Sequence, residues 1–146
     1  MFVIKRPSAD VARSQARKEV FNIKKVERTI QRAVENVENV SLQEILRRAS
    51  LQIINVNNIK TVDIQQILIR TSADLISEKN PNYQYVAAKL MIGDIRKEVW
   101  GSFVPKESLY NRVQHRIEQR GIYDPIILEK YTEEEMNRIE REIIKY

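Results

Sequence analysis

The fold is decided by one stretch of the sequence, IKTVDIQQILIRTSADLISEKNPNYQYVAAKLMIGDIRKEVWG, which covers residues 59–101. Apolar residues recur in it at helical spacing and predict two helices joined by a turn at residues 79–82. Pro81 is expected to end the first helix, because the residue before a proline is driven out of the α region. The second helix, over about 83–100, is apolar around most of its circumference, so we expect it to be buried on several sides.

Residues that favour helix ends flank this pair. Thr61 is placed to cap the first helix, since its hydroxyl can accept a hydrogen bond from a free backbone N–H of the opening turn. Asp63 suits the positive end of the same helix dipole. Gly101 follows the second helix, at a position where a left-handed residue is favoured.

The start of the chain predicts a small β-hairpin. Two short β-prone runs lie at residues 2–4 and 20–21. The connection between them, residues 8–18, is polar and unusually long for a hairpin.

Two further helices are predicted between the hairpin and the central pair. Asn22 can cap a helix whose apolar stripe runs as far as Val37. Ser41 and Glu44 have the spacing of a capping box, which opens the next helix. Residues 55–58 are then expected to form a polar turn.

The pattern changes after residue 101. Residues 102–105 are predicted to be a linker, and residues 107–119 form an amphipathic helix that ends at Gly121. Asp124 and Pro125 open a turn, and a capping box at residues 132–135 starts the last helix. That helix has a thin apolar stripe and many charges, so we expect it to need a partner surface.

These elements together predict a mainly α fold with a small N-terminal β-hairpin. A chain of 146 residues is long enough for one core with an appendage. We expect a helical bundle capped by the hairpin over residues 1–101, followed by extra helices over residues 102–146.

The composition excludes several kinds of chemistry. The chain has no cysteine, one histidine and three glycines. Disulfides, thiolate metal sites, a histidine-based triad and glycine-rich phosphate loops are therefore all excluded. The sequence contains no catalytic constellation, so we expect a binding protein that is not an enzyme on its own. The lack of cysteine, of an apolar span and of a signal peptide leads us to expect a cytoplasmic protein with no membrane partner.

The positive charge is concentrated at the N-terminus. Residues 1–32 contain nine Lys or Arg against three Asp or Glu, so this segment carries +6 and the rest of the chain −1. An anionic partner is therefore expected there. Four of these cations, Lys24, Lys25, Arg28 and Arg32, lie off the apolar stripe of the first helix, where a solvated helix face is the default interpretation.

A nucleoside triphosphate is one anion that the sequence can accommodate without glycines. Binding would need the N-terminus of a helix together with several Lys or Arg side chains. Thr61 provides the first feature. The second is provided by Lys5, Arg6, Lys25 and Lys97.

Several segments resemble a known family, the ATP-cone. They are Val3-Ile4-Lys5-Arg6, residues 19–26 (EVFNIKKV), Ile59-Lys60-Thr61, residues 81–88 (PNYQYVAA) and Arg96-Lys97. The ATP-cone is the allosteric domain at the N-terminus of the large subunit of class I ribonucleotide reductases. The tail, with Leu109-Tyr110, residues 121–124 (GIYD) and residues 131–135 (YTEEE), is similar to the helical segment that follows the cone in bacterial and phage reductases.

The resemblance implies a hairpin lid over a helical bundle that binds ATP as activator or dATP as inhibitor, with Mg²⁺. By position, it implies that the nucleotide site is lined by Lys5, Arg6, Glu19, Asn22, Lys25, Thr61 and Lys97. Glu19 and Asn22 would face the base or the lid. Thr61, Lys97 and the remaining basic residues would face the phosphates.

Two positions depart from the family pattern. Residues 7–18 replace a short hairpin turn with a longer insert, which can change the lid. Gln65 stands where many members have a histidine, one turn after Thr61. Because glutamine cannot carry charge, this departure bears on how ATP is distinguished from dATP.

Three functional hypotheses follow. The first is an allosteric nucleotide-binding module of ribonucleotide reductase, a separate regulatory piece whose partner is a catalytic chain or a second copy. The second is a degenerate fragment that docks on a catalytic chain without responding to nucleotide. The third, and the weakest, is nucleic-acid binding by the basic N-terminal segment, because aromatic residues make up only 7% of the chain.

Overall fold

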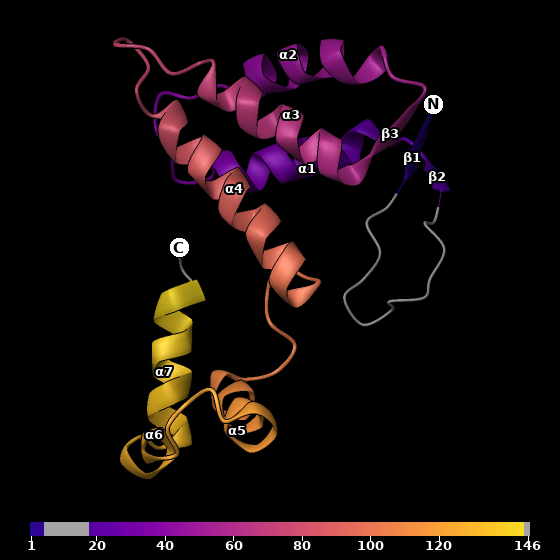
Figure 1. The fold of residues 1–146 in the computed structure, drawn as a ribbon. Helices are drawn as coiled ribbons and strands as arrows, with labels where there is room; N and C mark the ends of the chain where they lie inside the picture. The colour runs from indigo at the N-terminus through magenta and orange to yellow at the C-terminus, as the bar shows by residue number, and fades with distance from the viewer. Residues whose placement is uncertain (5–17, 145–146) are drawn as a thin grey trace. The chain divides into compact units, whose positions relative to one another are not determined.

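The computed structural model describes residues 1–4 and 18–144, with no account of the Arg120 side chain (Figure 1). The chain divides into two compact units, Met1–Gly101 and Ser102–Tyr146, and each is described by itself. The fold is mainly helical with a small N-terminal sheet, which confirms the predicted fold class. None of the helices in the described ranges is both long and apolar enough to cross a membrane.

Over the described residues the sheet has three strands, one more than the predicted hairpin. β1 (Phe2–Ile4) pairs antiparallel with β2 (Lys18–Val20) and parallel with β3 (Asn58–Lys60), in the order β2-β1-β3. The third strand falls where the sequence predicted the end of a polar turn. A single apolar residue, Ile59, marks it, and Ile59 is 2% exposed. So short a strand forms because β1 supplies its hydrogen-bonding partner from far along the chain.

The described part of the first unit also contains four helices. α1 (Ile23–Val34) and α3 (Thr61–Ala73) each follow a strand closely, so the sheet lies at one end of the helices (Figure 1). α2 (Leu42–Ile54) packs against α1 and α3, and α4 (Tyr83–Trp100) packs against the same two helices. The core combines residues of all four helices with the inward side chains of β1 and β3: Val3, Val26, Ile30, Ala33, Ile45, Ala49, Ile53, Ile59, Ile64, Leu68, Tyr83, Val86 and Leu90.

The predicted capping box at α2 forms only in part. The Ser41 hydroxyl accepts from the Glu44 N–H at 3.3 Å, as predicted. The Ser41 N–H donates to the Tyr83 hydroxyl instead of to Glu44. The Glu44 carboxylate is bound by the guanidinium groups of Arg47 and Arg48, which compete for the same oxygens.

The first helix of the central pair ends earlier than predicted. α3 ends at Ala73 rather than before Pro81. Ser77 and Asn80 form a local turn, in which the Asn80 N–H donates to the carbonyl and hydroxyl oxygens of Ser77. Directly after the helix the chain forms tighter turns, in which the Leu75 N–H donates to the Ser72 carbonyl and the Ile76 N–H donates to the Ala73 carbonyl.

The prediction that α4 is buried on several sides was wrong. Buried residues lie on one face of the helix, namely Tyr83, Val86, Leu90 and Gly93. Met91, Ile95 and Val99 are 55%, 49% and 65% exposed. Among the described elements of the first unit, α1 and α3 are the helices that pack closely on α4, so its outer face stays open. The predicted end of the helix is confirmed, because Gly101 has a φ of 70°.

The second unit is a small helical assembly. It contains α5 (Leu109–Arg120), the short α6 (Ile126–Lys130), which was not predicted, and α7 (Glu133–Ile144). Glu140 of α7 accepts hydrogen bonds from the Arg112 guanidinium and from the Leu109 N–H, so it joins α7 to the first turn of α5. The capping box at the start of α7 forms as predicted, since Thr132 and Glu135 exchange hydrogen bonds.

Candidate functional site

The candidate site lies at the end of the first unit where the sheet meets the helices. β2 leads into α1 through Phe21 and Asn22, and β3 runs directly into α3 at Thr61. The strand register places Glu19 and Ile59 on either side of Val3. Successive side chains of a strand point to opposite faces, and residues paired on neighbouring strands point to the same one. Glu19, Val3 and Ile59 therefore share the face that packs toward the core.

Glu19 and Lys25 are brought together as an ion pair. The Lys25 ammonium lies 2.8 Å from Glu19 Oε1 and joins β2 to the first turns of α1. The side chains are 58% exposed for Lys25 and 26% for Glu19, so an incoming anion can reach the ammonium. The two predicted site residues therefore form one polar group at the edge of the sheet.

Asn22 has a structural role that leaves only part of its side chain available to bind a ligand. It is the N-cap of α1, and its side-chain oxygen accepts from the Lys24 N–H at 3.0 Å. The amide NH₂ group is therefore the part of this side chain that can still be directed to a ligand acceptor.

Thr61 does not cap α3 as the sequence predicted. It is the first helical residue, and its hydroxyl donates to the Ile4 carbonyl at 3.0 Å. Lys60 occupies the N-cap position, and its N–H donates to Asp63 Oδ2 at 3.3 Å. The cause is that the backbone carbonyl of Ile4, at the end of β1, lies within reach of the hydroxyl. Thr61 thus ties the start of α3 to the end of β1.

Lys97 belongs to the last turns of α4, and the hydrogen bonds between α3 and α4 predict that it lies toward the start of α3. α3 and α4 are consecutive helices joined through residues 74–82, and their middles are joined by hydrogen bonds from Gln65 to Leu90 and from Gln66 to Asp94. That connection joins the end of α3 to the start of α4. The start of α3 and the last turns of α4 are therefore the ends of the two helices that lie away from it. Lys97 is partly buried in this region of α4.

Lys5 and Arg6 lie outside the described residues. They directly follow Ile4, the residue whose carbonyl Thr61 holds. Their part in the site stays a prediction.

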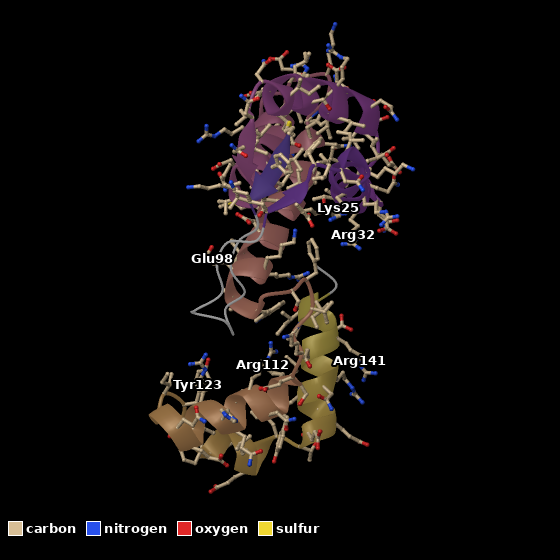
Figure 2. The ribbon with its side chains drawn as sticks, turned by 90° about the vertical axis from the view of Figure 1, so that its right-hand side faces the viewer. Lys25, Arg32, Glu98, Arg112, Tyr123 and Arg141 are labelled. Carbon is tan, nitrogen blue, oxygen red and sulfur yellow. The ribbon has the colours of Figure 1, made fainter. Side chains whose placement is uncertain are left out.

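The cations of α1 form an exposed face. Lys24, Lys25, Arg28 and Arg32 are all exposed, and Lys25 and Arg32 extend from the same side of the helix (Figure 2). Residues seven positions apart lie on one helix face, two turns from each other. The face adds positive potential beside the ion pair of Glu19 and Lys25.

Lys60 is a further cation directly before Thr61, which the sequence analysis did not consider. Ile4 lies between Lys18 and Lys60 in the register of the sheet, so these two lysines share the outer face, opposite to Glu19. The position of Lys60 directly before Thr61 was visible in the sequence. The strand β3 was not visible in the sequence. Without it, the face of the sheet on which Lys60 lies could not be assigned.

Metal binding by side chains finds no support in the part of the chain that the structure describes. It holds no group of three His, Cys, Asp or Glu side chains placed to bind an ion. What the described residues offer is cationic groups and a helix start, which together suit a phosphate-bearing anion.

Comparison with known proteins identifies the family. The ATP cone domain matches residues 10–98, more than half of the chain. The alpha subunit of ribonucleoside-diphosphate reductase 1 from Salmonella typhimurium is 39% identical over 134 residues, which are 92% of this chain and 17% of the relative. The corresponding Escherichia coli subunit is 38% identical over 84% of this chain and 16% of its own length.

A phage protein is similar over a shorter range. The reductase alpha subunit of Enterobacteria phage T4 is 38% identical over 68 residues, 47% of this chain and 9% of the relative. The chain spans only about a sixth of the Salmonella and Escherichia coli subunits, and its similarity is to their N-terminal region. The chain belongs to the ATP-cone domain family.

Proposed function

We propose that this chain is an allosteric module that binds ATP or dATP and regulates a ribonucleoside-diphosphate reductase. It would work in the cytoplasm on a catalytic chain and would have no catalysis of its own. Two nucleotides can produce different responses only if they bind the module's conformations with different affinity.

Two contacts at the sheet end of the first unit support the proposal, namely the ion pair of Glu19 with Lys25 and the hydrogen bond from Thr61 to Ile4. Glu19 and Lys25 are paired at 2.8 Å, and Thr61 is held against β1 at the start of α3. The proposal assigns Lys97 to the same site, because α4 packs against α3 and Lys97 lies in the last turns of α4. In this proposal Lys25, Lys97, Lys5 and Arg6 bind the phosphates, while Glu19 and Asn22 face the base.

Mg²⁺ would enter this site with the nucleotide. The described side chains include no cluster that could hold a cation by itself. Mg²⁺ keeps several waters and is commonly bound through phosphate oxygens. The residues of the site therefore fit a metal that the triphosphate carries.

Calorimetric titration tests the proposal. ATP and dATP are titrated into the wild-type chain, into Lys97→Ala and into Lys79→Ala, whose lysine is an exposed residue in the connection at the opposite end of α3. We expect saturable binding that Lys97→Ala weakens about tenfold or more and Lys79→Ala leaves unchanged, as loss of a charged hydrogen bond predicts. A folded chain that gives no heat with either nucleotide would overturn the proposal.

A docking fragment without nucleotide response is the second candidate. The second unit favours it, because Val113 and Met136 are the buried hydrophobic residues among its described positions. Six large apolar residues of this unit's helices and turns are 42% to 56% exposed: Ile122, Tyr123, Ile126, Tyr131, Ile139 and Ile143. So much exposed apolar surface on a small unit is typical of a surface that binds another chain. The same calorimetric titration separates the two candidates.

A further inference from the structure

Gln65 is a buried polar side chain between the two helices that carry Thr61 and Lys97. It is 7% exposed, and its amide Nε2 donates to the Leu90 carbonyl at 2.9 Å. A buried amide that lacked this partner would be destabilising, because it would lose its hydrogen bonds to water without a replacement. The bond is therefore a constraint that the packing of α3 on α4 has to satisfy.

The acceptor lies in the interior of α4. In a regular helix the Leu90 carbonyl also accepts from the N–H four residues later, so Gln65 uses the second lone pair of that oxygen. Apolar side chains can slide past each other at modest cost, whereas a buried hydrogen bond keeps its length and direction. Gln65 thus sets the position of α3 along α4.

The position of α3 along α4 determines the distance between Thr61 and Lys97. Thr61 lies one turn before Gln65 on α3, and Lys97 lies two turns after Leu90 on α4. Each helix is rigid over these few residues. A shift of α3 along α4 therefore changes the separation of Thr61 and Lys97 directly.

We propose that Gln65 is a positioning residue that holds Thr61 and Lys97 at the separation needed to bind the phosphates of a nucleoside triphosphate. The inference rests on the proposed function. It assigns Gln65 an action through Lys97 and not through contact with the ligand.

Gln66 provides a matched control. It is the next residue and also joins α3 to α4, but it is exposed and its bond to Asp94 is 3.4 Å long. Water can replace that bond, so its loss should not move the helices. Methionine has a similar length to glutamine and no donor, which makes Gln65→Met and Gln66→Met comparable changes.

The experiment measures affinity for ATP and for AMP by calorimetry in the wild type, Gln65→Met, Gln66→Met and Lys97→Ala, and in the double variant Gln65→Met with Lys97→Ala. We expect Gln65→Met to weaken ATP binding about fivefold to tenfold and AMP binding less than twofold, since AMP lacks the outer phosphates. In the Lys97→Ala background the effect of Gln65→Met on ATP should nearly vanish, because two residues that act through one contact are not additive. Gln66→Met should leave both affinities unchanged.

The outcomes are distinct. A wild-type chain that binds no nucleotide would remove the proposed function, and this inference with it. ATP binding that Gln65→Met leaves intact, or that it weakens equally with and without Lys97, would overturn the inference alone. If Gln65→Met unfolds the chain, Gln65→Asn repeats the test, since it keeps a buried amide that is one methylene too short to reach Leu90.

Discussion

The Thr61 hydroxyl donates a hydrogen bond of 3.0 Å to the carbonyl of Ile4, a residue 57 positions earlier in the chain. This bond joins the first residue of α3 to the last residue of β1. It therefore links α3 to the strand that precedes Lys5 and Arg6 in the sequence. A residue predicted to serve its own helix instead connects two distant elements.

Replacing Thr61 with valine tests this connection. Thr61→Val keeps the shape of the side chain and removes the donor, so we expect a loss of about 1 kcal/mol in the free energy of unfolding. Urea denaturation followed by circular dichroism measures the change. We also expect weaker nucleotide binding, because β1 is no longer held at the start of α3.

Thr29→Val is the control for that variant. The Thr29 hydroxyl donates to the Lys25 carbonyl within α1, at 3.0 Å. Removing this hydroxyl therefore breaks no contact between distant elements. A smaller loss of stability than for Thr61→Val is expected, with nucleotide affinity unchanged. Equal effects of the two variants on affinity would contradict the role given to Thr61.

Lys25 and Lys24 should differ in their effect on nucleotide binding. Both are exposed on α1, but Lys25 is ion-paired with Glu19 on the core-facing side of the sheet. Lys25→Met should weaken ATP binding by about tenfold to a hundredfold, the range expected for one charged hydrogen bond. Lys24→Met should change it only through the general positive potential, and calorimetry at low and moderate salt separates the two effects. Similar losses that disappear together in salt would indicate a nonspecific cationic face.

Glu44 makes the stability of the first unit depend on pH in the acid range. Hydrogen bonds from Arg47 and Arg48 hold the pKa of the Glu44 carboxyl at about 2, against an ordinary value of 4.5. Because the folded-state pKa is lowered, these bonds stabilise the fold above pH 4.5 and their contribution is lost as the pH falls toward 2. The Glu44 side chain is 30% exposed, so water and salt screen part of the effect.

An NMR titration of the Glu44 carboxyl carbon tests this assignment. We expect a midpoint near pH 2 in the wild type, and a midpoint closer to 4.5 in the double variant Arg47→Ala with Arg48→Ala. A wild-type midpoint near the ordinary value would mean that the two guanidinium groups do not hold Glu44 in solution.

The sequence predicted those features whose causes are local. Asn22 caps α1, and Thr132 with Glu135 forms the capping box of α7, because these bonds join residues two or three positions apart. The strand at Ile59 could not be predicted, since its stability comes from pairing with β1. Thr61 was assigned the wrong partner for the same reason.

For the candidate site, the sequence predicted a set of residues but not their arrangement in space. Periodicity predicted the pairing of α3 and α4, but it gave no sign that the Gln65 amide would reach Leu90. The exposure of Met91, Ile95 and Val99 was also hidden, because an apolar residue count does not tell how many neighbours a helix has. Contacts between distant segments decide such questions.

Gly121 provides a test in the second unit, where only the backbone conformation is changed. It ends α5 with a φ of 56°, and the N–H groups of Gly121 and Ile122 donate to the Ile117 and Arg116 carbonyls. An added Cβ would meet no atom within 4 Å, so no steric clash contributes. Gly121→Ala should therefore cost about 1 kcal/mol, the penalty for a side chain in the left-handed region. Gly121→Asn should cost less, because asparagine tolerates that region. Hydrogen exchange of the α5 amides measures both variants, with the α2 amides as an internal reference for the first unit. Equal protection of α5 in Gly121→Ala and the wild type would show that the left-handed end is not required in solution.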